Sequence, residues 1–258
     1  MIVHDCEQGS ERWKALRLGI ATASSFDKII TPKTRKYSAQ ADKYIDRLVA
    51  EWLLGKEVID VYESRAMERG KELEPQARAW YSMDQDVDVA TPGFVTTADE
   101  WFGCSPDGTV DGLGRGVEIK CREATAHVGI LRGGVTASPT QVQGSMWITG
   151  YDEWDSVAYH PDLPKVVRRW ERDPEWMAAF DEHMPRFLEE LQAARAQMLD
   201  EYGITPADRH TCAQRIRVLI DAGRVSESEA GEWLRIANHG NGLWVSKILD
   251  DYEEKDHE

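Results

Sequence analysis

The stretch that most restricts the fold of this chain is residues 104–121, CSPDGTVDGLGRGVEIKC. It contains a Pro-Asp-Gly turn sequence around Asp107 and ends in a short apolar run that is typical of a buried strand. The intervening segment is rich in Gly and Asp, as a hairpin connection should be. Glu118 and Lys120 stand two positions apart in the apolar run, so both side chains point to the same face of the predicted strand.

This charged face predicts a cation site. A hairpin brings Asp107 close to Glu118 and Lys120, whereas Val117 and Ile119 point to the opposite face and can enter the core. Two carboxylates that meet in this way repel each other unless a cation lies between them. Carboxylate oxygens suit Mg²⁺ or Mn²⁺, which can activate water and stabilise charge on a phosphodiester. Three roles are then open to Lys120: it could orient the attacking water, deprotonate it, or neutralise the developing charge.

Each half of this pattern occurs in ordinary proteins, because Pro-Asp-Gly is a common turn and Glu-x-Lys is common on a solvated strand. The two halves occur here in a specific order, eleven positions apart, and are joined by a hairpin signal. This combination matches the PD-(D/E)xK constellation of nucleases. The residues alone therefore indicate a metal-dependent phosphodiesterase.

Helix and strand signals alternate along the chain, which predicts the α/β class (α+β mixed): a central mixed sheet flanked by helices. Strand signals occur at 91–97, 101–108, 116–121, 154–160 and 165–173. Helical signals occur at 11–17, from about 22–24, at 41–55, 64–83, 140–149 and 174–199. Ser138 and Asp173 each precede a proline, a typical start of a helix.

The sequence changes character near residue 204, which predicts two domains: a catalytic core over 1–203 and a helical C-terminal appendage over 204–258 with an acidic tail. Pro206 is placed to open one helix of the appendage. Ser226 and Glu229 form a capping box for another.

Composition narrows the range of partners. The net charge of −15 and the pI of about 5.0 exclude a broadly basic nucleic-acid surface, although residues 11–17 and 31–36 are locally basic.

No apolar run approaches the roughly 18 residues that span a bilayer, and the N-terminus has no signal-peptide pattern. We therefore expect a cytoplasmic protein without a membrane partner. The four cysteines form no CxxC pair, so a zinc or iron–sulfur site is not indicated.

Five stretches resemble the lambda-exonuclease type of the YqaJ-like viral recombinase family, within the PD-(D/E)xK nuclease superfamily. They occur in the family's order over residues 7–195: EQGSERWKALRLGIATAS, RGKELEPQARAWY, GCSPDGTVDGLGRGVEIKC, TQVQGSMWITG and WMAAFDEHMPRFLEEL. The resemblance implies a PD-(D/E)xK, restriction-endonuclease-like core and a Mg²⁺-dependent enzyme, with Mn²⁺ as a substitute. It also implies a 5′-to-3′ exonuclease that acts on 5′-phosphorylated ends of double-stranded DNA and leaves a 3′ single strand.

The resemblance further implies a biological setting. Proteins of this type form ring-shaped homotrimers and act with a single-strand annealing protein in phage homologous recombination. Their location is the cytoplasm of the bacterial host, with the gene carried by a phage or prophage.

The resemblance assigns roles at the predicted cation site. Asp107 and Glu118 match the metal-binding carboxylates, and Lys120 matches the catalytic lysine. The backbone carbonyl of Ile119 would also bind a metal. Glu74, in GKELEP, matches a helix carboxylate that completes the metal site, although such a residue is by itself an ordinary exposed helix acid.

Other matched residues lie outside this cluster. Gln141 matches a residue near the nucleophilic water. Arg17 and Ser24, assisted by Thr22, match the group that grips the terminal 5′-phosphate; a guanidinium fork and a helix N-terminus both suit that anion. Trp13 matches an exposed aromatic of the partner-binding region, although a packed core tryptophan is an equally good interpretation.

The chain departs from the family pattern in two places. After Cys121 the sequence REATAHV differs, so Arg122 and Arg132 are only candidate contacts to the DNA backbone. Residues 204–258 have no counterpart in the resemblance, which leaves three roles open for them: packing against a neighbouring subunit, binding a partner, or serving as a neutral extension.

Two alternative functions are kept. One is another PD-(D/E)xK DNA endonuclease, of a repair or Cas4-like type; the latter normally carries a cysteine cluster, which the scattered cysteines do not supply. The other is a non-catalytic module that binds DNA ends or a recombinase. The presence of Asp107, Glu118 and Lys120 together argues against that second alternative.

Overall fold

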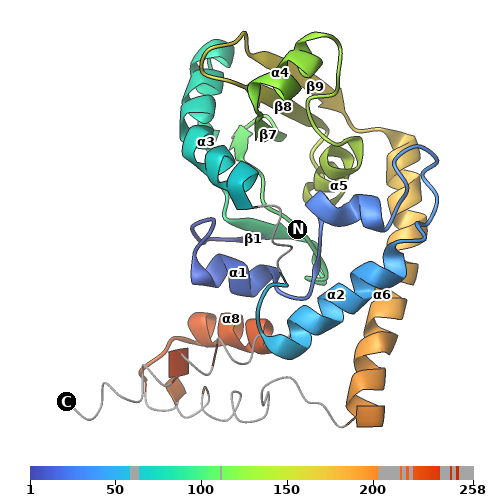
Figure 1. Cartoon of the computed structure of the whole chain (residues 1–258). Coiled ribbons are helices and arrows are strands. Elements are labelled where there is room, and N and C mark those ends of the chain that lie inside the picture. Colours follow the sequence, from blue (N-terminus) through green and yellow to red (C-terminus); the bar gives the residue numbers. More distant parts are fainter. Residues whose placement is uncertain are drawn as a thin grey trace. The chain divides into compact units, whose positions relative to one another are not determined.

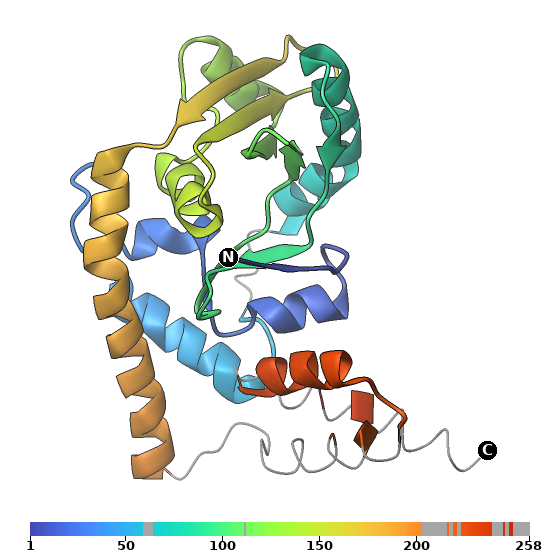
Figure 2. The ribbon, with the colours of Figure 1, turned by 180° about the vertical axis from the view of Figure 1, so that it is seen from behind.

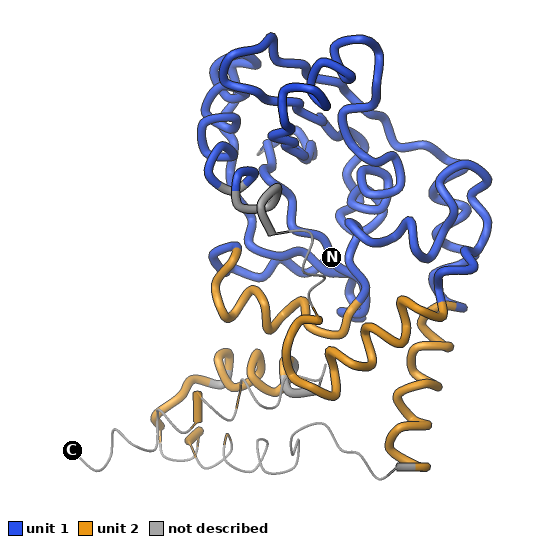
Figure 3. The backbone as a smooth tube through the Cα atoms, in the orientation of Figure 1, with its two compact units in different colours: residues 1–8, 21–41, 59–186 blue, residues 9–20, 42–58, 187–258 orange. Residues whose placement is uncertain are grey.

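The computed structural model describes residues 1–58, 64–110 and 112–202, and in the C-terminal part residues 216, 219–220, 223–238, 245 and 248–249. The chain divides into two compact units, which Figure 3 distinguishes by colour. Unit 1 comprises residues 1–8, 21–41 and 59–186, and unit 2 comprises residues 9–20, 42–58 and 187–258. Each unit is assembled from three separate segments, so neither is a continuous stretch of sequence.

Unit 1 contains two mixed sheets. The first has the order β1 (Ile2–His4), β4 (Phe94–Thr96), β5 (Phe102–Cys104) and β2 (Ala21–Thr22). Strand β2 runs parallel to β5, and the other neighbours are antiparallel. The predicted antiparallel pair of strands around the turn at residues 98–100 corresponds to β4 and β5.

The second sheet carries the Glu-x-Lys strand at its centre. Its order is β3 (Val89–Ala90), β6 (Gly108–Val110), β7 (Arg115–Cys121), β8 (Glu153–Tyr159) and β9 (Val166–Glu171). Strands β7 and β8 are parallel along their whole length, and the remaining neighbours are antiparallel. The predicted mixed α/β core is therefore confirmed, with its strands shared between two sheets.

Helices cover both faces of the second sheet (Figures 1 and 2). Helix α3 (Ser64–Gln85) packs Ala77 and Tyr81 against Val117 and Ile119 of β7. On the other face, helix α5 (Pro139–Thr149) packs Val142 and Met146 against Trp154 of β8. Because successive side chains of a strand point to opposite faces, Glu118 lies on the α5 side of β7.

The helix starts follow the predicted signals with two differences. Helix α6 (Pro174–Tyr202) begins after Asp173, whose Oδ1 accepts the backbone N–H of Glu175 at 2.8 Å. Helix α5 begins at Pro139, but the Ser138 side chain makes no capping hydrogen bond. The segment predicted as a helix from residues 22–24 is the short 3₁₀ helix η1 (Ala23–Lys28). Helix α3 continues through Pro75, and a short helix α4 (Ala124–Leu131) follows β7.

Unit 2 contains α1 (Glu11–Arg17), most of α2 (Ala41–Leu54), the C-terminal part of α6 and α8 (Glu227–Asn238). Gly55 ends α2 with a left-handed φ of 62°, as predicted. The predicted capping box is present: the Ser226 Oγ accepts the backbone N–H of Glu229 at 3.2 Å, and the Glu229 carboxylate receives the Ser226 N–H.

The C-terminal residues pack on α1. A cluster of buried apolar residues joins Ala15 of α1 to Ala230, Trp233 and Ile236 of α8. The guanidinium of Arg12 also donates to both carboxylate oxygens of Glu232, at 2.7 and 2.6 Å. Residues 203–215 and the acidic tail lie outside the described residues, so the domain boundary at 203/204 and the helix at Pro206 stay predictions. None of the described helices combines the length and apolarity needed to cross a lipid bilayer.

Candidate active site

The position of Asp107 differs from the prediction in one respect. The strand predicted over 101–108 would place Asp107 near its end, but β5 ends at Cys104 and Asp107 lies in the connection that leads into β6. The register of β6 and β7 pairs Gly108 with Val117, which places Asp107 beside the centre of β7. The Asp107 Oδ2 accepts the backbone N–H of Ile119 at 2.6 Å. The hairpin that joins the two halves of the motif is therefore β6–β7.

Glu118 and Lys120 form a close ion pair on β7. The Lys120 Nζ lies 2.5 Å from the Glu118 Oε1, and the Gln141 Nε2 of α5 donates to the same oxygen at 2.7 Å. Glu118 is buried, with 3% of its surface exposed, which differs from a strand face open to solvent. The negative charge of Glu118 raises the pKa of Lys120, so this side chain is held as an ammonium.

Helix α3 brings a third carboxylate to the site. Glu74 pairs with Arg78 one helical turn later, and the Arg78 Nε donates to the backbone carbonyl of Asp107 at 2.7 Å. Burial raises the pKa of Glu74, while the charge of Arg78 lowers it and that of Glu118 raises it. Arg78 thus joins two of the predicted metal ligands, and sequence reasoning missed it. The Glu-Arg spacing of four on a helix was the available signal.

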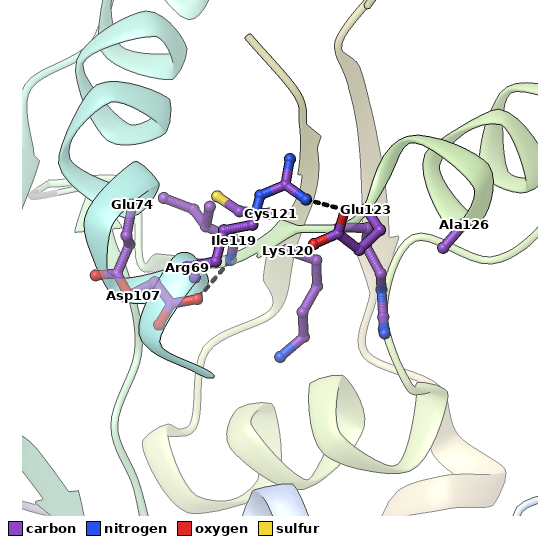
Figure 4. Close-up of a pocket in the computed structure, with 10 residues that line it drawn as sticks. Arg69, Glu74, Asp107, Ile119, Lys120, Cys121, Glu123 and Ala126 are labelled. Carbon is purple, nitrogen blue, oxygen red and sulfur yellow. Dashed lines mark hydrogen bonds and ion pairs between the residues drawn. The ribbon is translucent and has the colours of Figure 1, made fainter. Parts of the chain in front are cut away.

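A cleft of about 490 Å³ opens beside these residues (Figure 4). Figure 4 shows Glu74 and Asp107 next to each other, with Lys120 projecting from the neighbouring strand. The cleft is lined by Arg69, Gly70, Glu74, Asp107, Ile119, Lys120, Cys121, Arg122, Glu123 and Ala126. Glu118 and Gln141 do not contribute to this lining, and Glu118 reaches it only through its ion pair with Lys120.

The electrostatics of the cleft fit a divalent cation. Desolvation, followed by the negative charges of Glu118 and Glu74, raises the pKa of Asp107 well above its usual range. Within the described ranges, no group of three or more acidic, histidine or cysteine side chains already forms a metal cage. Instead, Glu74 pairs with Arg78 and Glu118 pairs with Lys120. Asp107 accepts the backbone N–H of Ile119. Oxygen donors that repel one another across a cleft are the chemical type that Mg²⁺ or Mn²⁺ binds.

Replacing Asp107 by Asn should stabilise the protein in the absence of divalent ions. The pKa of Asp107 is higher in the folded protein than in the unfolded chain. Ionisation of this carboxyl group therefore lowers the free energy of unfolding as pH rises from the unfolded-state pKa through the folded-state pKa. Asparagine keeps an acceptor for the Ile119 N–H and carries no charge. We expect the free energy of unfolding at neutral pH in EDTA to rise by about 0.5–2 kcal/mol, as is common when a functional charge is removed.

The matched measurement is thermal unfolding with and without Mg²⁺. The wild type should gain stability on adding the ion, and Asp107→Asn should lose most of this gain. Asp88→Asn removes the same charge at an exposed position outside the cleft and should change neither value. An Mg²⁺-induced shift that is equal in the wild type and Asp107→Asn would contradict metal binding at Asp107.

The residues predicted to bind a 5′-phosphate fall in both units. In unit 1 the hydroxyls of Thr22 and Ser24 lie 3.2 Å apart at the start of η1, where Thr22 is buried and Ser24 is exposed. In unit 2 the guanidinium of Arg17 lies over the Trp13 ring, 4.2 Å from its centroid. Trp13 is partly exposed, so it is not a fully packed core residue. The phosphate-binding role of these residues and the partner-binding role of Trp13 stay predictions.

The strand arrangement and this cleft define the chain as an α/β protein with a PD-(D/E)xK, restriction-endonuclease-like core. The sequence profile of the YqaJ-like viral recombinase domain matches residues 12–152, more than half of the chain. The chain therefore belongs to the YqaJ-like viral recombinase domain family.

Solved structures support this membership. The alkaline exonuclease LHK-Exo from Laribacter hongkongensis is 32% identical, with a TM-score of 0.66; the match covers 75% of this chain and 98% of that one. A structure of LHK-Exo in complex with dAMP matches equally well. A phage-related exonuclease from Haemophilus somnus 129PT, 17% identical with a TM-score of 0.53 over 69% of this chain and 96% of its own, shares the fold.

A curated protein is also similar. The putative uncharacterized protein ExoD of Escherichia coli (strain K12) is 36% identical over 66 residues, which cover 24% of this chain and 76% of ExoD.

Proposed function

We propose that this protein is a divalent-metal-dependent exonuclease that degrades double-stranded DNA from 5′-phosphorylated ends in the 5′-to-3′ direction and leaves a 3′ single strand. The observation that carries the proposal is a cleft lined by Asp107, Glu74 and Lys120, with Glu118 paired to Lys120, in a YqaJ-family chain. Its similarity to LHK-Exo, an alkaline exonuclease, supports the nuclease assignment.

The carboxylates of Glu74, Asp107 and Glu118, with the backbone carbonyl of Ile119, would hold the metal. A bound Mg²⁺ would supply Lewis-acid stabilisation of phosphoryl oxygen charge and would activate water for attack. Lys120, held as an ammonium beside Glu118, suits neutralisation of the developing negative charge better than proton abstraction. Gln141 contacts Glu118, and from there it would help to orient the carboxylate and the attacking water.

Selection of a 5′ end would come from Arg17, Ser24 and Thr22. A guanidinium binds phosphate oxygens through two parallel hydrogen bonds, and the paired hydroxyls of Thr22 and Ser24 add further donors. A terminal phosphate carries more charge than an internal phosphodiester, so such a site would hold each newly formed 5′ end. This gives the enzyme its direction.

The proposed setting follows the family. A homotrimer would encircle the duplex, and a single-strand annealing protein, contacted through a surface that includes Trp13, would receive the 3′ strand during phage-type recombination in the bacterial cytoplasm. A net charge of −15 suits a protein whose basic residues are confined to its DNA channel, because the outer surface then repels DNA.

The direct test is digestion of a linear duplex that carries a 5′-phosphate on one strand only. We expect the phosphorylated strand to be degraded from its 5′ end in Mg²⁺, the other strand to persist, and EDTA to stop the reaction. Covalently closed circles should remain intact. Cleavage of closed circles would instead support a PD-(D/E)xK endonuclease, and binding of ends without any turnover would support a non-catalytic module.

A further inference from the structure

The cleft continues beyond the proposed metal ligands to an end that carries two arginines. Arg69 belongs to α3 and Arg122 directly follows Cys121, the last residue of β7, so the two arginines reach the cleft from different elements. Arg122 is exposed. Among the described residues that line it, this end of the cleft has Arg69 and Arg122 against the single carboxylate of Glu123, so it is locally positive in a chain with a net charge of −15.

A carboxylate already occupies this end of the cleft. Glu123 forms an ion pair with the Nη1 of Arg69, which links the segment after β7 to α3 (Figure 4). The hydrogen bond from Arg69 lowers the pKa of Glu123, so the carboxylate stays ionised. The Glu123 side chain is 73% exposed, and the Arg69 side chain is 28% exposed. An incoming anion can therefore displace the carboxylate without any rearrangement of the core.

We propose that Arg69 and Arg122 form a binding site for a phosphodiester of the DNA strand next to the scissile group, and that Glu123 holds this site in the free protein as a substitute for the phosphate. The carboxylate and the phosphodiester both present two oxygens to a guanidinium fork. The inference rests on the proposed function, because it adds a second phosphate contact to the same DNA-binding cleft.

The charges give the two side chains opposite effects on DNA affinity. Arg69 attracts the phosphate directly, so its loss should weaken binding. Glu123 competes with the phosphate for Arg69, so its neutralisation should strengthen binding. A pair that served only to stabilise the fold would give two losses, because either substitution breaks the same contact.

The experiment measures fluorescence anisotropy of a labelled DNA duplex with 5′-hydroxyl ends, in EDTA, at several salt concentrations. Without a divalent ion no cleavage interferes, and without a 5′-phosphate the end pocket makes no charged contact. Arg69→Gln should weaken binding on the order of tenfold, the effect of one charge-assisted hydrogen bond. It should also reduce the slope of log K against log salt by about 0.9.

Glu123→Gln should tighten binding about two- to fivefold, since it frees Arg69 from an exposed ion pair. In the Arg69→Gln background the same substitution should have no effect, because the competing partner is gone. Glu182→Gln is the matched control: it removes the same charge from a similarly exposed glutamate on α6 and should leave affinity unchanged. Arg69→Lys keeps the positive charge, so it should retain most of the dependence of log K on log salt. This variant is the second measurement of the proposal in case Arg69→Gln does not fold.

The results separate this inference from the proposed function. Weaker or unchanged binding by Glu123→Gln, or an unchanged salt slope in both Arg69 variants, would overturn the second phosphate site while leaving the exonuclease proposal intact. Tightening by Glu123→Gln that persists in the Arg69→Gln background would also overturn it. A wild-type protein that does not bind duplex DNA at all would overturn both.

Discussion

A variant with Lys120 replaced by Met should bind duplex DNA normally and lose nearly all nuclease activity. Lys120 is the ammonium closest to the proposed metal carboxylates, 2.5 Å from Glu118, and its pKa is raised by that neighbour. Methionine fills a similar volume without the charge. Removal of one group that stabilises transition-state charge or transfers a proton commonly costs about 10²–10⁴ in rate. The measurement is the initial rate on a linear 5′-phosphorylated duplex in saturating Mg²⁺.

The control is Lys165→Met, which removes a partly exposed lysine whose ammonium lies over the Tyr159 ring, outside the cleft lining. Its rate should match that of the wild type. The DNA affinity of Lys120→Met in EDTA shows whether the substitution weakens binding. Its thermal unfolding shows whether the substitution destabilises the fold. A rate within tenfold of wild type, at unchanged affinity, would contradict the role assigned to Lys120.

Replacing Arg17 by Gln should reduce discrimination between 5′-phosphoryl and 5′-hydroxyl ends. Wild-type protein should degrade 5′-phosphorylated duplex faster, because a terminal phosphate offers Arg17 a bidentate, charge-assisted contact. Without the guanidinium the rate on phosphorylated ends should fall by about 10- to 100-fold. The rate on 5′-hydroxyl ends should change little. The measured quantity is the ratio of the two initial rates at subsaturating DNA.

Lys14→Gln supplies the matched control on the same helix. Lys14 forms an exposed ion pair with Glu11 at 2.6 Å, so its replacement also removes one positive charge from α1. It should leave the ratio unchanged. Equal wild-type rates on both kinds of end would rule out a terminal-phosphate pocket. An equal loss on both ends in Arg17→Gln would assign Arg17 a general role in binding DNA.

Local sequence patterns were sufficient to predict most helices and strands. The Asp173-Pro174 start of α6, the Gly55 end of α2 and the Ser226 capping box depend on neighbours within a few residues. The alternation of Val117, Glu118 and Ile119 similarly separates a core face from a charged face within one strand. Such features can be predicted from the sequence because they depend on interactions between residues that are close together in the chain.

Other features were misread or missed because they depend on partners far away in the chain. Strand β6 has only three residues, and it forms because β3 and β7 pair with it on both sides. The helix predicted from residues 22–24 is a 3₁₀ helix of only six residues, 23–28. The burial of Glu118 could not be read from its strand, because α5, more than twenty residues away, supplies the Gln141 amide that satisfies it.

The mixed α/β class, most helices, five of the strands and the charged face of the motif strand could be predicted from the sequence alone, because spacing and polarity act locally along the chain. The contact of Arg78 with both Glu74 and Asp107, and the pairing of Glu123 with Arg69, became visible in the folded chain and not before. The same holds for the packing of the C-terminal residues on α1. These contacts depend on which elements meet in space, and their energies come from desolvation and charge at close range.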